Sequence, residues 1–197
     1  MNNGRERWQG RAGVALKGWR TDLSRKERAG DRAALGRLAA PADAMLLACF
    51  AELCNWAVGA EDFDAHRIEA LARCAFLAGR LSRFEDGASL AAAMARRQGS
   101  RRPLVSPVRA SALFSLEDAD QACLTIGTML GTLGGRTSAC LDPLATLRAM
   151  SNWDWERRRI ALGYHRANAP QEASAGLAAP DPQAAPDPLI LQPGSPT

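Results

Sequence analysis

Residues 64–81 read DAHRIEALARCAFLAGRL, and this stretch predicts the class of the fold. Its apolar positions are Ile68, Leu71, Cys74 or Ala75, and Ala78. They recur at intervals of three and four residues, which is the spacing of one face of an α-helix. The same spacing runs through most of the chain before residue 168, and no stretch alternates with period two over more than a few residues. The sequence therefore predicts an all-α protein of about seven or eight helices.

Boundary signals place the other expected helices. These cover roughly residues 14–23, 43–56, 88–97, 108–114, 116–133, 142–152 and 154–165, and a charged turn leads from the first of them into residues 31–38. Asp43 and Asp154 are expected as N-caps, and Ser106-Pro107 combines a capping serine with a proline in the first turn. Ser115 begins a sequence that resembles a capping box, and Gly134-Gly135 would end the helix that follows it.

The composition divides the chain into a folded part and a tail. Residues 1–166 are expected to form one compact helical bundle, or two helical lobes that meet near residues 98–106. From residue 167 to 197 the chain is rich in Ala and Pro, and 7 of its 11 prolines lie there. Such a segment buries too little apolar surface to offset its ordering entropy, so a disordered tail is expected. Within it, Leu189–Leu191 is a candidate docking peptide.

The apolar segments and the cysteines indicate a cytoplasmic protein. No run approaches the length of a membrane span, and the N-terminus enters charged residues at once, without a signal peptide. The five cysteines fall singly in apolar stretches, and the chain has only two histidines. We therefore expect reduced core thiols, with no disulfide framework, metal site or other cofactor.

Positive charge is concentrated in the expected folded part. Residues 1–166 carry all 25 basic side chains against 18 of the acidic ones, a net charge of +7, and 23 of the 25 are arginine. The planar guanidinium donates two parallel hydrogen bonds to a phosphate. This composition is typical of a protein that binds nucleic-acid backbone, although a GC-rich genome also enriches arginine.

Several segments, in order, resemble the CasB family, the small subunit of the type I-E CRISPR Cascade complex. They are Trp19 with Leu23; GDRAALGRL at 30–38; Phe50 with Leu53; Arg102–Leu104 with 106–114; LGTLGGR at 130–136; Trp153; and ERRRIALGYH at 156–165. Each segment is short, and the resemblance depends on their order and spacing over residues 17–166.

The resemblance implies a subunit without an active site that takes part in antiviral defence. It would be present in two copies beside the crRNA-bearing backbone subunits and the large subunit. It would contact crRNA and target DNA, including the displaced strand, as part of a ribonucleoprotein complex and not at a membrane. Protein contacts to backbone matter there because the RNA–DNA hybrid is about as stable as the duplex it replaces.

Eight arginines are the candidate phosphate contacts. They are Arg37, Arg67, Arg101, Arg102, Arg109, Arg157, Arg158 and Arg159. The last three fan over roughly 200° of a helix, so all three are not expected to face one strand. Most of the five tryptophans are expected in the core or at a subunit interface, and Trp155 is the best candidate to stack on a base because arginines follow it.

Two other classes of function remain open. An enzyme is disfavoured, because the chain lacks a phosphate-binding glycine loop, an H-E-x-x-H sequence and a Gly-x-Ser-x-Gly elbow. The acidic group Glu61, Asp62 and Asp64 has no second acidic cluster to join it in metal binding. A free-standing helical DNA-binding regulator is the stronger alternative, and it would need a recognition helix with base-reading side chains.

Overall fold

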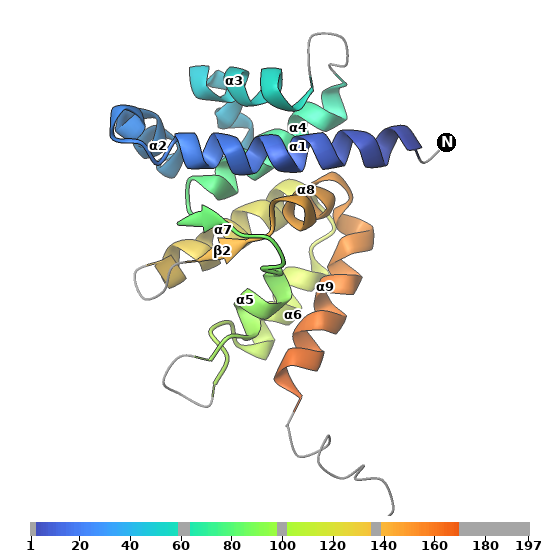
Figure 1. The fold of residues 1–197 in the computed structure, drawn as a ribbon. Helices are drawn as coiled ribbons and strands as arrows, with labels where there is room; N and C mark the ends of the chain where they lie inside the picture. The colour runs from blue at the N-terminus through green and yellow to red at the C-terminus, as the bar shows by residue number, and fades with distance from the viewer. Residues whose placement is uncertain (1–2, 59–63, 98–101, 135–138, 170–197) are drawn as a thin grey trace, which may run out of the picture.

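The computed structural model describes residues 3–58, 64–97, 102–134 and 139–169 (Figure 1). Its α-helices are α1 (Asn3–Asp22), α2 (Ala29–Gly36), α3 (Ala48–Ala57), α4 (Ala65–Ala78), α5 (Leu90–Ala95), α6 (Pro107–Ser115), α7 (Ala119–Gly134), α8 (Pro143–Ser151) and α9 (Trp153–Asn168). Two 3-10 helices, η1 (Lys26–Arg28) and η2 (Pro41–Leu46), join the first helices. The predicted all-α class is confirmed.

Helix α4 is deeply buried and packs against elements from distant parts of the chain. Every residue from Ala70 to Ala78 is buried, because η2, α7 and α8 all pack against this helix. Of the positions predicted to face the core, Leu71, Cys74, Ala75 and Ala78 are buried, and Ile68 is half-buried. A helix with eight or more consecutive buried residues has no solvent face, so its apolar positions extend beyond one stripe.

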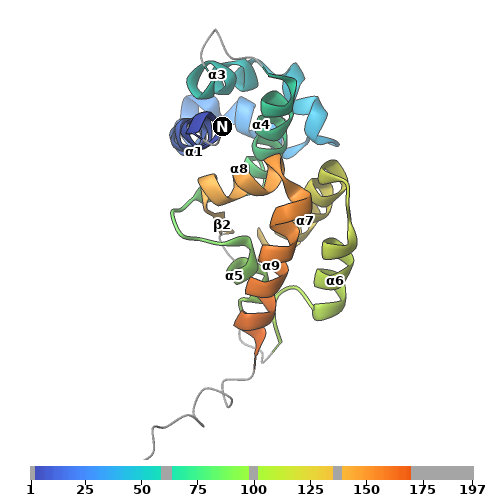
Figure 2. The same ribbon diagram turned by 90° about the vertical axis from the view of Figure 1, so that its right-hand side faces the viewer.

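The other helices form two groups. Helices α1, α2 and α3 lie beside α4, helices α5, α6 and α9 lie at the far end of the molecule, and α8 lies between the two groups (Figures 1 and 2). Helix α1 packs on α3 and α8, and α5 packs on α9. One buried cluster continues from Trp8 to Tyr164 and includes Val105, within the range 98–106 where two lobes were expected to meet.

Helix α1 begins much earlier than predicted, at Asn3 instead of near Val14. Its N-terminal half buries Trp8 and Ala12, a spacing of one helical turn. Glycines weakened the local helix signal there. At Gly13 an added Cβ would lie 3.4 Å from the Cβ of Leu144, an ordinary van der Waals distance, so α1 packs directly on α8 there.

Three predicted caps are wrong. Asp43 accepts a hydrogen bond from the Ala40 N–H at 2.8 Å inside η2, and α3 begins only at Ala48. Ser115 is the last residue of α6, and its hydroxyl donates to the carbonyl of the preceding turn. Asp118 caps α7 instead, accepting from the Gln121 N–H at 2.8 Å. Asp154 lies within the first turn of α9, which begins one residue earlier.

Two features differ from the helical pattern. Strands β1 (Arg83–Phe84) and β2 (Cys140–Leu141) form one short parallel pair, which the sequence did not predict because two residues are too few to show alternation. Helix α9 continues to Asn168, past the expected boundary at residue 166. Residues 170–197, most of the expected tail, lie outside the described residues.

Candidate nucleic-acid interface

Some arginines are used to hold the fold together. Buried Arg20 donates from Nε to the Ala78 carbonyl at 3.0 Å and from Nη2 to the Leu81 carbonyl at 2.6 Å, at the C-terminal end of α4. Burial, with a smaller effect of nearby Arg32, lowers the pKa of the Arg20 guanidinium. Arg73 joins α4 to Asp120 of α7 at 2.6 Å. These guanidinium groups are not available to a phosphate.

Arg157, a predicted phosphate contact, also serves the fold. Its side chain is only 13% exposed, and it pairs with Asp154 at 2.6 Å. It also donates to the Leu116 carbonyl at 3.0 Å, the same oxygen that accepts from the indole of Trp153 at 2.8 Å. This arrangement holds α9 to the turn between α6 and α7.

Two more predicted contacts have partners within the protein. The Arg67 guanidinium carbon lies 5.4 Å from the ring centroid of buried Trp8, a cation–π contact, and Arg67 is half-buried. Arg159 is exposed but pairs with Glu156 at 2.6 Å. To bind a phosphate, each of these two arginines would have to give up its present contact.

Arg37, Arg109 and Arg158 are exposed and make neither an ion pair nor a side-chain hydrogen bond within the described residues. Arg37 is the C-cap residue of α2, Arg109 lies in the first turn of α6, and Arg158 lies on the outer face of α9. Of the eight predicted contacts, these three therefore have an exposed guanidinium group with no described partner.

The base of the loop after α5 gathers further arginines. An isolated antiparallel bridge pairs Arg97 with Pro103, and the Leu104 N–H donates to the Arg96 carbonyl at 2.8 Å. This pairing brings Arg96, Arg97 and Arg102, all exposed, to one end of α5. Arg101, another predicted contact, lies outside the described residues.

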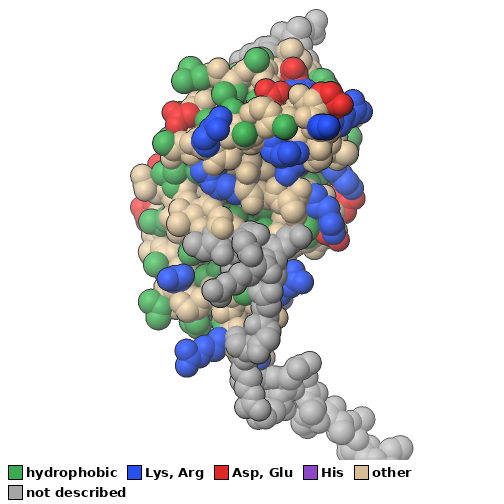
Figure 3. Space-filling model, turned by 90° about the vertical axis from the view of Figure 1, so that its left-hand side faces the viewer, with side chains coloured by type: hydrophobic (Ala, Val, Ile, Leu, Met, Phe, Trp, Pro, Cys, Tyr) green, Lys and Arg blue, Asp and Glu red, His purple; other side chains and the backbone are tan. Residues whose placement is uncertain are grey.

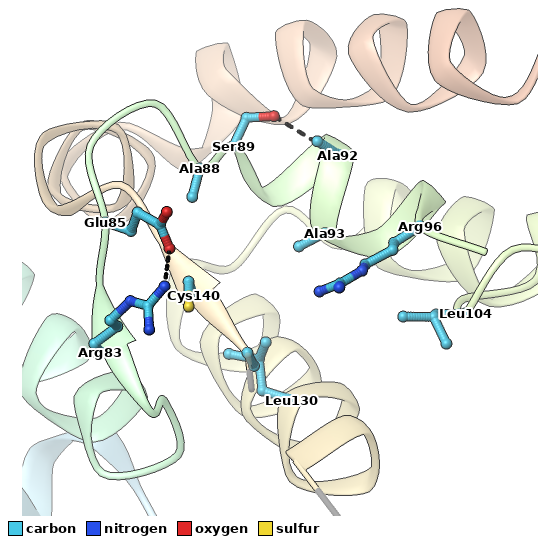
Figure 4. A pocket seen from close by; sticks show the side chains of 11 residues that line it. Arg83, Glu85, Ala88, Ser89, Ala92, Ala93, Arg96, Leu104, Leu130 and Cys140 are labelled. Carbon is cyan, nitrogen blue, oxygen red and sulfur yellow. Dashed lines mark hydrogen bonds and ion pairs between the residues drawn. The ribbon is translucent and has the colours of Figure 1, made fainter. Parts of the chain in front are cut away.

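A cleft of about 610 Å³ opens between α5, α7 and the strand pair, and we call it the α5 cleft. Arg83 and Arg96 both line it, and Arg96 extends from α5 toward the strand pair (Figure 4). Arg83 hydrogen bonds to Glu85 at 2.9 Å, which lowers the pKa of that carboxyl and keeps it charged. Arg96 therefore supplies the net positive charge of the cleft. Arg96 is not one of the eight predicted contacts, and the Arg96-Arg97 doublet was the sequence signal that could have indicated it.

In all, nine exposed arginines make no ion pair or side-chain hydrogen bond within the described part of the chain. They are Arg7, Arg11, Arg37, Arg96, Arg97, Arg109, Arg148, Arg158 and Arg166. They lie on several faces. On the face that carries α2 and the end of α7, basic side chains outnumber acidic ones (Figure 3). The arrangement is that of a dispersed basic surface and not of one deep site.

The tryptophans divide into core and surface. Trp8, Trp19 and Trp153 are buried, as predicted, and Trp155 is 66% exposed, as the best stacking candidate should be. Of the two places expected for a tryptophan, the core and a subunit interface, the core does not hold Trp56, which is 52% exposed at the end of α3. Four of the five cysteines are buried, and Cys140 is half-buried beside the α5 cleft.

The described residues offer little for metal-dependent chemistry. No three of their His, Cys, Asp or Glu side chains lie close enough together to hold a metal ion. Glu61 and Asp62 lie outside the described residues, and Asp64 caps α4 by accepting from the His66 N–H at 3.1 Å. No helix in the described residues is long and apolar enough to cross a membrane.

Comparison with known proteins returned no relatives: no protein-family model, no curated protein and no solved structure matches the chain. The resemblance to the CasB family stays a prediction from the sequence.

Proposed function

We propose that this chain is the non-catalytic small subunit of a type I-E CRISPR Cascade complex. It binds the backbone of crRNA and target DNA, including the displaced strand, and stabilises the R-loop. Nine exposed arginines without a described partner are the observation that carries this proposal. Each such arginine that binds a phosphate releases condensed counterions, so a few contacts per copy tip a strand exchange that is nearly balanced.

The distribution of charge favours backbone binding over sequence reading. Helices α6 and α7 are joined by only three residues, as in a helix-turn-helix, which would make α7 the recognition helix. Helix α7 contains no Lys or Arg, and its first turn carries Asp120. Such a helix offers no cation to the phosphates and carries a carboxylate at the N-terminal end that makes the base contacts in a recognition helix, which argues against the alternative of a free-standing DNA-binding regulator.

Binding of the purified chain to labelled single strands and duplexes, measured over a series of salt concentrations, tests the proposal. Three to five phosphate contacts predict a slope of log K against log salt of about −2 to −4 on single strands. Affinity for scrambled sequences is expected to be the same within a factor of about three, because backbone contacts carry no sequence information. A specificity ratio of about a thousand or more would instead identify a regulator.

Reconstitution tests membership of the complex. Mixed with crRNA and the backbone and large subunits of a type I-E complex, the chain is expected to co-elute in two copies per complex. Incubation with DNA and magnesium or manganese is expected to give no cleavage. Failure to enter the assembly, or metal-dependent nuclease activity, would overturn the proposal.

A further inference from the structure

A second cavity, of about 290 Å³, lies between α5, α8 and α9, and we call it the α9 cavity. Its interior is apolar, with Leu77, Ile126, Met150 and Ile160 among the lining residues. It exists because the three helices present small residues to one another. These are Ala91 of α5, Ala145 and Ala149 of α8, and Gly163 of α9.

The mouth of the α9 cavity is basic. Arg159 and Arg166 line it, but Arg159 is already paired with Glu156 at 2.6 Å. Arg166 is exposed and has no side-chain partner within the described residues. The cavity therefore matches a ligand with an aliphatic body and one neighbouring carboxylate.

The C-terminal segment of the chain itself has this chemistry. Residues 170–197 contain three acidic side chains and no Lys or Arg. Within them, Asp187-Pro188 immediately precedes Leu189-Ile190-Leu191, the one run of three large aliphatic residues in that segment. We propose that Leu189–Leu191 bind in the α9 cavity while Asp187 pairs with Arg166.

The residues between α9 and Leu189 are numerous enough to reach the α9 cavity, and they follow directly from a helix that lines it. Arg166 lies in the last turn of α9, so the segment begins beside the mouth of the cavity. The 17 residues from 170 to 186 span at most about 60 Å, well beyond what a return to α9 requires. A connection of this length gives an effective concentration in the range of about 1 mM, so a peptide that binds only weakly in trans is still largely bound in cis.

A spin label at the end of the chain tests this proposal in the full-length protein. Gly194→Cys carries the label in a Cys140→Ser background, because Cys140 is the most exposed of the cysteines. The expected result is paramagnetic broadening of amide signals that line the α9 cavity, such as those of Ala91 and Gly163. Broadening spread evenly over the surface would overturn the proposal.

Substitutions in the C-terminal segment distinguish specific binding in the α9 cavity from nonspecific contact. Leu189→Asp with Ile190→Asp is expected to reduce the broadening about tenfold, because a carboxylate is costly to bury in an apolar cavity. Leu177→Asp makes the same kind of change elsewhere in the segment and is expected to change it less than about twofold. Equal effects of both changes would contradict the assignment.

Two further measurements test whether the α9 cavity is the binding site and whether the segment comes from the same chain. Ala145→Phe fills the cavity from α8 and is expected to release the segment while the rest of the spectrum is retained. If that variant unfolds, Arg166→Gln provides a milder test, with an expected loss of about two- to fivefold in the bound population. A mixture of labelled and isotope-enriched chains is expected to show no broadening at the cavity, whereas strong broadening would identify a second copy as the occupant.

Discussion

Arg157 and Arg158 are neighbours in the sequence, but the structure predicts opposite consequences for their loss. Arg157→Gln removes a charged hydrogen bond of 3.0 Å to the Leu116 carbonyl, a bond worth about 1.5–3 kcal/mol. That oxygen keeps its bond from Trp153, so the lower end of the range applies. The pair with Asp154, whose side chain is 69% exposed, adds about 0.3–0.5 kcal/mol. The expected loss of unfolding free energy is roughly 2 kcal/mol.

Urea and thermal unfolding measure this loss, and salt-dependent DNA binding measures the other property. Arg157→Gln is expected to lower the melting temperature by about 4–8 °C and to leave the salt slope of DNA binding unchanged. Arg158→Gln is expected to change unfolding free energy by less than about 0.5 kcal/mol and to reduce the slope on single strands by about 0.7. The reverse outcome, a stable Arg157 variant with a reduced slope, would refute the division of arginines into structural and available groups.

Three other predictions concern the buried groups. Arg20→Met removes the guanidinium that donates to the Ala78 and Leu81 carbonyls. The Ala78 carbonyl keeps its 3.4 Å bond from the Leu81 N–H, so the expected cost in urea unfolding is about 2–3 kcal/mol, and a cost under about 1 kcal/mol would contradict it. Tyr164→Phe removes the 2.7 Å bond from the buried phenol to the Val105 carbonyl and is expected to cost about 1–2 kcal/mol, so an unchanged unfolding midpoint would count against that bond. At pH 8 a thiol reagent is expected to modify Cys140 first, because burial raises the pKa of Cys49 to about 11 and leaves almost no thiolate there; mass spectrometry that finds Cys49 labelled first would disprove this order.

Much of the fold follows from local sequence signals. The apolar spacing of residues 64–81 predicted helix α4, and Ser106-Pro107 predicted the start of α6. The errors at Asp43 and Ser115 share one physical cause: a side chain that caps well is also common in turns, and the neighbouring structure decides between the two. The β1–β2 contact joins residues far apart in the chain, so local spacing carried no sign of it.

The candidate interface was less predictable from sequence than the fold. Arg157 and Arg158 are chemically identical, and only the packing of α9 against the α6–α7 turn buries one and exposes the other. Arg96 became a candidate only when α5 and the strand pair formed a cleft around it. Whether a long side chain is exposed or paired depends on tertiary contacts, and the local sequence does not predict those contacts.

R-loop lifetime in the reconstituted complex is the most direct test of the central claim. The triple variant Arg37→Gln, Arg109→Gln and Arg158→Gln removes three exposed arginines that lack a described partner. The matched control Arg25→Gln, Arg83→Gln and Arg159→Gln removes the same charge from arginines already paired with acids. The account predicts that the triple variant shortens the lifetime at least about tenfold at moderate salt while the control changes it less than about threefold. Equal lifetimes for the two variants would contradict it.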